Sequence, residues 1–170
     1  MQYSSALTDI GETQLLADED IGCVIPHVPE SFFGDYNWSL SSIRLGRLTS
    51  IAYSSLFSIT AASRSKETLR KTIPVVRQHL ESWRLSVSPR FRPEEPIQLE
   101  EDAAPSTKFV FLETQYHYHN ILIAVEKLSL QVDVQDTAKR QESMYRLMQS
   151  AQTVIELTRF IDTKGFVNIL

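Results

Sequence analysis

The sequence predicts an all-α protein built as a multi-helix bundle. In four segments, apolar residues recur every three or four positions, which is the period of an amphipathic helix. Strand-like alternation is weak throughout, and no Asn-Gly or Asp-Gly pair signals a hairpin. Hydrophobic residues make up 42% of the 170 residues and charged residues 22%, as in ordinary globular proteins. The chain therefore has enough apolar material for one helical core.

Residues 1–37 are expected to form a mostly irregular, acidic lead-in to this helical part. The first 35 residues hold seven Asp or Glu and no Lys or Arg, and Pro26 and Pro29 oppose a helix there. Cys23, the single cysteine, lies among apolar and acidic neighbours. We therefore interpret it as a small packed residue and not as a reactive thiol. A single cysteine also excludes an internal disulfide and a cysteine-rich zinc site within this chain.

The first helix is expected over residues 40–62. Its apolar stripe consists of Leu45, Leu48, Ala52, Leu56 and Ile59. Ser39 or Ser41 is expected as the N-cap, because a side-chain hydroxyl accepts hydrogen bonds from the free N–H groups of the first turn. Gly46 lies inside this helix and indicates close packing of a neighbouring helix, since glycine otherwise costs about 1 kcal/mol there relative to alanine.

The second helix is expected over residues 66–85. Its stripe consists of Leu69, Ile73, Val76, Leu80 and Trp83. Pro74 is expected to kink this helix or to begin a new segment, because proline removes one backbone donor. At the helix end, Trp83 is expected to cap the core. The prolines and acidic residues that follow predict a loop over 86–105.

The third helix is expected over residues 106–130 with Ser106 as its N-cap, and the fourth over 137–162 with Gly165 as a C-cap. The predicted buried side of the third helix consists of Phe109, Leu112, Tyr116, Ile123 and Leu130, widened by Phe111, Tyr118, Leu122 and Val125. That of the fourth consists of Met144, Leu147, Met148, Ala151, Ile155, Thr158 and Phe160. From the four helices we single out as structural core candidates Leu48, Leu56, Leu80, Trp83, Leu112, Tyr116 and Ile155.

No residue is predicted to be catalytic, to bind a cofactor or to bind a metal. His117 and His119 are two positions apart, so on a helix they point about 200° apart and cannot share a metal ion. Glu113 lies four residues before His117, and a surface hydrogen bond is the expected contact. No phosphate-binding glycine loop or nucleophile-elbow motif is present. The longest apolar stretches are shorter than the roughly 20 residues of a membrane-spanning helix.

Charge is unevenly distributed along the chain, although the net charge is only −4. Residues 64–92 hold eight Lys or Arg against two Glu, and residues 94–102 then add five acidic residues. We interpret these runs as solvated faces that attract one another within the fold. A nucleic-acid-binding face is the alternative, and the acidic flank opposes it.

Three segments together carry a resemblance to a known family. They are, in order, Leu16-Ala-Asp-Glu-Asp-Ile-Gly-Cys-Val-Ile-Pro26; Ile43-Arg-Leu-Gly-Arg-Leu with Ile51-Ala-Tyr-Ser-Ser-Leu-Phe57, leading into Leu80-Glu-Ser-Trp-Arg-Leu-Ser-Val-Ser-Pro-Arg-Phe-Arg-Pro93; and Leu112-Glu-Thr-Gln-Tyr-His-Tyr-His-Asn-Ile-Leu-Ile123. In order and spacing, the set resembles the middle homology region of fungal zinc-cluster transcription factors, over residues 15–162. The chain departs from that pattern at Val125-Glu126-Lys127, where the family often has His-Arg-Pro, and at the alanine-poor start of the fourth helix.

The resemblance implies the regulatory and interaction region of a nuclear transcription regulator, controlling a metabolic or secondary-metabolite gene set, and it implies no enzyme activity. In that family, a separate cluster of six cysteines with two zinc ions contacts DNA, so this chain alone is not expected to bind DNA. The partners implied are other regions of the regulator or other proteins, and homo- or hetero-oligomers stay open. Because the family domain is longer, we expect an incomplete bundle, either truncated or a fragment.

Two other functions are kept beside this one. A helical scaffold, or a truncated remnant, would bind a partner protein and have no DNA-linked activity. A small helical enzyme or ligand carrier would require a polar-lined pocket near Trp83, Tyr116 or His117.

Overall fold

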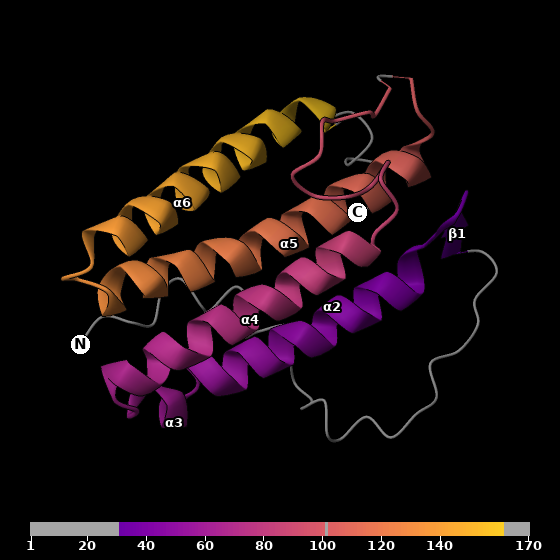
Figure 1. Ribbon diagram of the computed structural model, residues 1–170. Helices are drawn as coiled ribbons and strands as arrows, with labels where there is room; N and C mark the ends of the chain where they lie inside the picture. The colour runs from indigo at the N-terminus through magenta and orange to yellow at the C-terminus, as the bar shows by residue number, and fades with distance from the viewer. Residues whose placement is uncertain (1–30, 101, 162–170) are drawn as a thin grey trace.

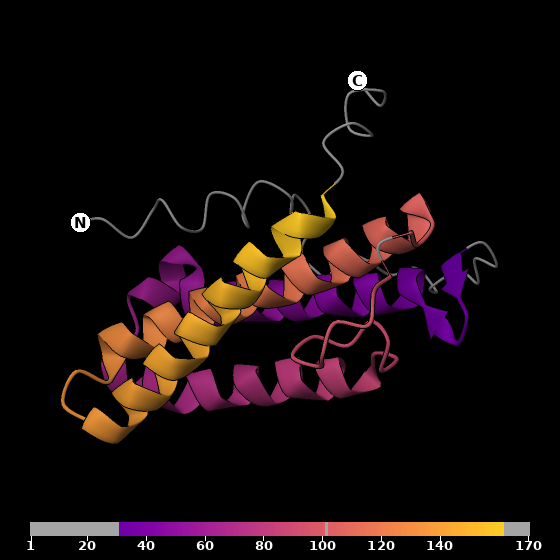
Figure 2. The same ribbon diagram turned by 90° about the horizontal axis from the view of Figure 1, so that it is seen from above.

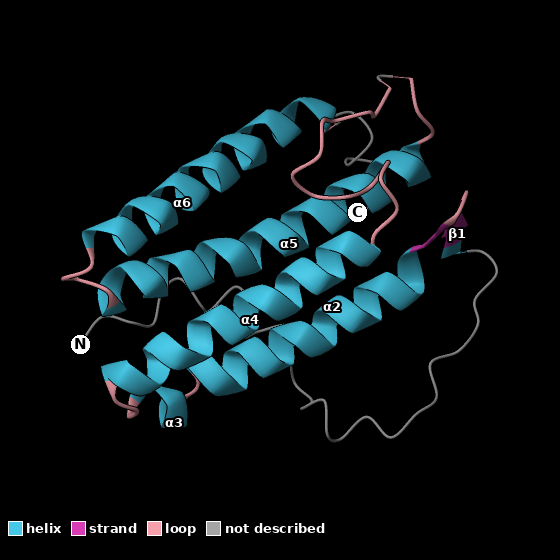
Figure 3. Ribbon diagram, viewed as in Figure 1, coloured by secondary structure: helices cyan, strands magenta, loops and turns pink. Residues whose placement is uncertain are grey.

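The computed structural model describes residues 31–100 and 102–161, and this part of the chain is mainly helical, with one short hairpin and loops between helices (Figures 1 and 3). The predicted all-α class is therefore confirmed. The hairpin pairs β1 (Phe32–Phe33) with β2 (Tyr36–Asn37) in antiparallel register. The helices are α2 (Trp38–Ala52), η3 (Tyr53–Phe57), α3 (Ile59–Ala62), α4 (Lys66–Ser86), α5 (Pro105–Val132), α6 (Thr137–Leu157) and η4 (Thr158–Phe160). Cys23 and the proposed C-cap Gly165 lie outside the described residues.

Three long helices form the centre of the bundle, and the fourth packs on its outside. Helices α2, α4 and α5 each contact the other two, whereas α6 makes its main contacts with α5. Figure 1 shows α6 at the edge of the row of helices, and Figure 2 shows it crossing over α5. Helix α5 is therefore the central element, with neighbours on several sides. This position explains why α5 buries residues around much of its circumference.

The hairpin was not expected from the sequence, because its strands are only two residues long. Gly34 has a φ of +67°, a backbone conformation that glycine adopts without a steric penalty. The Tyr36 ring stacks on Phe91 with centroids 4.8 Å apart, and its hydroxyl lies 3.1 Å from Thr114 Oγ1. The hairpin is thereby attached to the core, so the predicted irregular lead-in of residues 1–37 ends in ordered structure.

Helix α2 begins two residues earlier than predicted. Its N-cap is Asn37, whose Oδ1 accepts a hydrogen bond of 3.1 Å from the Leu40 amide. The predictions of Ser39 and Ser41 as N-caps are therefore wrong. An asparagine side chain caps as well as a serine does, and the hairpin already fixes its backbone in the extended conformation that an N-cap requires.

The single helix predicted over 40–62 is wrong, because the chain changes its helical winding and then breaks. Residues Tyr53–Phe57 form a π-helical turn, in which the Ser58 amide reaches back five residues to the Tyr53 carbonyl at 2.8 Å. Ser58 is then extended, and its hydroxyl caps α3 by accepting from the Ala61 amide. Serine side chains compete with the helix for backbone hydrogen bonds, and Ser55 also bonds the Ile51 carbonyl at 2.6 Å.

Helix α4 has the predicted stripe, which is buried in full: Leu69, Ile73, Val76, Leu80 and Trp83. The helix continues through Pro74 without beginning a new segment, and it ends at Ser86, where the predicted loop follows. The Trp83 indole N–H donates to the Ser41 carbonyl at 2.9 Å, and its ring stacks on Tyr118. Trp83 therefore joins α2, α4 and α5 in the core, as expected for an aromatic residue with one polar atom to satisfy.

Helix α5 begins at Pro105, which occupies the first turn, where a missing N–H costs nothing. The N-cap is Ala104, so the prediction of Ser106 is wrong. Phe109, predicted to be buried, is 54% exposed and contacts Trp38 edge to face.

Four of the seven core candidates lie in the buried core, two lie at its margin and one is exposed. Leu48, Leu56, Leu80 and Trp83 are buried, and Leu112 and Tyr116 are partly buried against the core. Ile155 is wrong, because it is 70% exposed. The physical reason is the orientation of α6, which is described below.

Gly46 gives a first testable prediction. A Cβ atom at Gly46 would meet nothing within 4 Å, so the prediction that this glycine allows close helix packing is wrong. We expect Gly46→Ala to raise the free energy of unfolding by about 1 kcal/mol in urea titrations, because alanine favours the helix. Gly34→Ala is the matched control and should lower it, because Gly34 has a positive φ. A loss of stability in Gly46→Ala would contradict the described packing.

Candidate interaction surface

The inward face of α6 combines two serines with a leucine. Its buried members are Ser143, Ser150 and Leu157, spaced seven residues apart along the helix. Such a spacing places the three on one side. Serine side chains are short, so the backbone of α6 can approach α5 closely at these two positions. Helix α6 is therefore docked by a face that is polar at Ser143 and Ser150 and apolar at Leu157.

A buried ion pair explains why that polar face turns inward. The Glu126 side chain of α5 is fully buried, and Arg77 of α4 donates to both of its carboxylate oxygens, from Nε at 2.8 Å and from one terminal nitrogen. The same terminal nitrogen of Arg77 also donates to Ser129 Oγ and Ser143 Oγ, each at 3.0 Å. We call Arg77, Glu126, Ser129 and Ser143 the polar junction. It ties α4, α5 and α6 together at one point.

Further contacts hold the same end of the bundle. Arg70 of α4 donates from Nε to Asp133 Oδ1 at 3.1 Å and from Nη2 to the Val132 carbonyl at 2.9 Å. Arg140 of α6 donates to the Leu130 carbonyl at 2.8 Å. These arginines satisfy carbonyl groups at the C-terminus of α5, where a helix has no partners of its own and where positive charge is favourable.

The outward side of α6 carries an exposed apolar stripe. We define the outer stripe as Met144, Met148, Ala151 and Ile155. All four are exposed, Met148 at 65% and Ile155 at 70%. The neighbouring Tyr145 is also exposed, at 57%. The prediction that these four stripe residues pack inward is therefore wrong.

The sequence prediction failed here because α6 has two faces with helical spacing. Met144, Met148, Ala151 and Ile155 follow a spacing of four, three and four, and so do the residues of a buried helix face. The competing face has Ser143 and Ser150, which a hydrophobicity pattern disfavours. Burying Glu126 without partners would cost several kcal/mol. Arg77 supplies the partners of Glu126, and the hydroxyl of Ser143 in turn accepts from Arg77, so the serine face is the one that packs.

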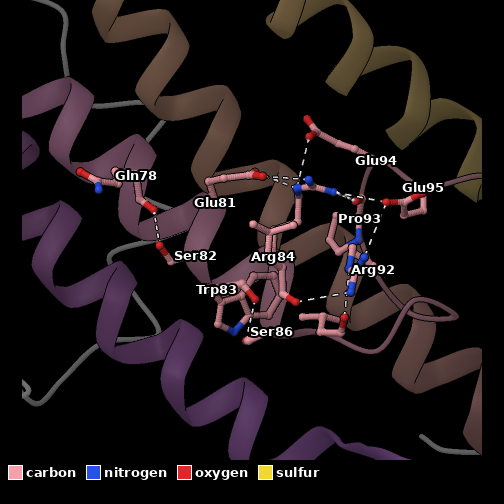
Figure 4. A network of polar contacts seen from close by, with 12 residues as sticks. Gln78, Glu81, Ser82, Trp83, Arg84, Ser86, Arg92, Pro93, Glu94 and Glu95 are labelled. Atoms are coloured by element: carbon pink, nitrogen blue, oxygen red, sulfur yellow. Dashed lines mark hydrogen bonds and ion pairs between the residues drawn. The ribbon is translucent and has the colours of Figure 1, made fainter.

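A second cluster of polar contacts fastens the loop after α4 (Figure 4). The Arg84 guanidinium donates to both Glu81 oxygens, at 2.7 and 2.8 Å, and to the Pro93 carbonyl at 3.1 Å. Glu94 and Glu95 of the loop lie 3.7 and 3.8 Å from Arg84. The hydrogen bonds from Arg84 hold the pKa of the Glu81 carboxyl below its usual value. As predicted, basic and acidic runs attract one another within the fold here.

The residues of the ligand-carrier alternative do not come together as one polar site. The Trp83 indole N–H donates a hydrogen bond to the Ser41 carbonyl inside the core. His117 is more than half exposed, and its Nδ1 lies 3.9 Å from Glu113 Oε1, which is beyond a hydrogen bond. Tyr116 is partly buried against the core. In residues 31–100 and 102–161, no three His, Cys, Asp or Glu residues are grouped so that they could hold a metal ion.

His119 is a residue that sequence reasoning did not single out as buried. It is 1% exposed, and neither ring nitrogen has a hydrogen-bond partner among the described residues. The ring meets Tyr118 edge to face, with centroids 5.2 Å apart. Burial lowers the pKa of His119 to about 4. The imidazole is therefore neutral at pH 7 and acts as a core side chain.

Comparison with known proteins adds no relative. No protein-family model, no curated protein and no solved structure matches the chain. Among the described helices, none is long and apolar enough to cross a membrane. The outer stripe of α6 is the apolar feature of the described surface that suits a protein contact.

The polar junction gives the second testable prediction. Arg77→Met should lower the free energy of unfolding by about 3–5 kcal/mol, because it leaves the Glu126 carboxylate buried without its charge partner. The double variant Arg77→Met/Glu126→Leu should recover most of this loss. The control is Arg146→Met, which removes an exposed pair with Glu142 and should cost less than about 0.5 kcal/mol. Equal effects of Arg77→Met and Arg146→Met in urea titrations would contradict a stabilising junction.

His119 gives the third testable prediction. Its pKa is lower in the folded chain than its ordinary value of 6.5, so the unfolded chain binds the proton more tightly. This residue's contribution to stability is complete above pH 6.5 and is lost as the pH falls toward 4. Between pH 7 and pH 5 we expect a loss of roughly 2 kcal/mol from this group.

The measurement compares urea titrations of the wild type and His119→Leu at both pH values. The variant should lose less stability than the wild type on acidification, by roughly that amount. His117→Leu, at an exposed histidine on the same helix, should behave as the wild type does. An unchanged pH dependence in His119→Leu would show that His119 does not titrate as described.

Proposed function

We propose that this chain is the regulatory and interaction region of a transcription regulator of the fungal zinc-cluster type. In this proposal the outer stripe of α6 is the surface that docks another protein segment. The single observation that carries the docking role is the exposure of Met144, Met148, Ala151 and Ile155 in a row on one helix. Contiguous exposed apolar residues on a soluble surface mark interaction sites more often than isolated ones do.

Two further observations support the choice of an interaction region. Ser143 of the polar junction fastens α6 to the bundle, so the outer stripe lies on a packed helix and not on a loop. Charged residues are absent from positions 147–155, and the buried centre of a protein interface is likewise poor in charge. The link to transcription comes from the order of the three resembling segments in the sequence. Gene control by contacts with other regions of a regulator, without DNA binding by this chain itself, is what that resemblance implies.

The fourth testable prediction concerns a reporter gene. The full chain is fused to a heterologous DNA-binding domain in a fungal host, and reporter output is compared with that of the DNA-binding domain alone. We expect the fusion to change the output, and we expect Met148→Glu to reduce that change about tenfold, because a buried charge at an apolar anchor costs more than about 1.4 kcal/mol of docking energy.

Ile59→Glu is the matched control. Ile59 is 92% exposed on α3, outside the outer stripe, so this variant should keep the wild-type output. Urea titrations should give both variants the stability of the wild type, since both side chains lie in solvent. An unchanged output from the fusion would favour the scaffold without DNA-linked activity. Tight binding of a promoter fragment by the purified chain would contradict the proposal as well.

A further inference from the structure

The outer stripe has a spacing that reads the same in both directions along the helix. From Met144 the steps are four residues to Met148, three to Ala151 and four to Ile155. A stripe with alternating steps of three and four is the pattern by which two helices pack side by side. Because the order of steps is symmetric, a second α6 turned end to end meets the first with every stripe position opposite another stripe position.

The side chains in the stripe also differ in size in a way that suits this arrangement. With the two-fold axis between positions 148 and 151, Met148 lies opposite Ala151 of the partner subunit, so a long side chain meets a short one. Met144 lies opposite Ile155 of the partner subunit. A parallel pair would instead place methionine against methionine and alanine against alanine. Two large side chains would then crowd one position of the interface, and two small ones would leave unfilled space at another.

We propose that the occupant of the outer stripe is a second copy of this chain, docked through α6 in antiparallel orientation. This inference rests on the proposed function, because it names the partner of the same surface. A partner helix must offer an apolar stripe that it does not use in its own fold. Among the described long helices, α2 and α4 bury their stripes within this chain and α5 lies at its centre, whereas α6 leaves its stripe exposed.

The size of the stripe sets the strength of the pairing. From Met144 to Ile155 the stripe covers about 16 Å of helix, at a rise of 1.5 Å per residue. Met144, Met148 and Ile155 are exposed by 50%, 65% and 70%, so three side chains of about 200 Å² supply on the order of 400 Å² per copy. Stable interfaces bury about 800 Å² per partner. The stripe is smaller than this, so the pairing is expected to be weak and reversible.

The first test measures the mass of the full chain by sedimentation equilibrium between about 1 and 500 μM, a range that covers weak dimers. We expect a monomer–dimer equilibrium in the wild type and an increase of at least tenfold in the dissociation constant for Met148→Glu. Ile59→Glu, on the exposed α3, should dimerise as the wild type does. A monomer throughout the range, or a dimer that Met148→Glu leaves unchanged, would overturn the inference.

The second test examines orientation with a short bismaleimide cross-linker in a Cys23→Ser background. A chain with Met144→Cys is mixed with a differently tagged chain carrying Ile155→Cys. Antiparallel pairing brings positions 144 and 155 of two copies level, so the mixture should cross-link. Either variant alone should not, because its own two cysteines would lie roughly 16 Å apart along the helix. Cross-linking of each variant alone would indicate the parallel arrangement and overturn the inference.

The outcomes separate this inference from the proposed function. If the chain is monomeric but Met148→Glu still abolishes the reporter effect, the stripe binds another protein. The inference that a second copy occupies it is then wrong. If Met148→Glu abolishes the dimer but leaves the reporter effect unchanged, the inference that a second copy occupies the stripe is confirmed. The proposed role of the stripe in gene control is then wrong.

Discussion

The ion pair between Arg77 and Glu126 is the constraint on which the arrangement of the bundle depends. A carboxylate with no solvent exposure must be neutralised and hydrogen bonded, and Arg77 reaches it from a neighbouring helix. The remaining donor capacity of the arginine then requires acceptors, which Ser129 and Ser143 supply. One buried charge therefore fixes the rotation of α4, α5 and α6 relative to one another. Hydrophobic contacts, which have no direction, cannot specify that rotation by themselves.

The same constraint links the interior of the protein to its surface. Because Ser143 must face the junction, α6 cannot turn Met148 and Ile155 inward. The exposure of these apolar residues is thus a consequence of a polar requirement on another side of the same helix. Glu126 also belongs to the short segment at which the chain departs from the fungal transcription-factor pattern, so the departure falls at the residue that organises the helices.

The sequence pattern predicted those elements whose burial is decided locally. The stripe of α4 is correct in every member, because α4 carries one clear apolar face. The bounds of α4 and α5 were likewise placed within two residues by their period, whereas the helix predicted over 40–62 ends at Ala52. The N-caps of α2 and α5 lie two or more positions before the predicted serines, since Asn37 caps α2 well and Pro105 suits the first turn of α5. The break at Ser58 depends on hydroxyl-to-backbone bonds that a hydrophobicity pattern does not record.

What the pattern could not reveal is pairing across long distances in the chain. Arg77 and Glu126 are 49 residues apart, and Arg77 and Ser143 are 66 apart. One signal was present, because each charged residue has helical spacing to apolar positions: Arg77 lies four residues after Ile73, and Glu126 lies four residues after Leu122. Two opposite charges in otherwise buried positions predict a partner for each other, but only a fold can show that they meet.

The attachment of α6 mainly to α5 has a consequence for how the molecule opens. Helices α2, α4 and α5 each contact the other two. Helix α6, in contrast, can separate once its contacts with α5 and the hydrogen bond between Arg77 and Ser143 are lost. Its backbone amides should therefore exchange with solvent deuterium sooner than those of α4, as in proteins whose peripheral segments unfold as separate units. A partner that binds the exposed surface of α6 would slow this exchange. The helix that offers the surface is thus also the one whose order a bound partner would increase most.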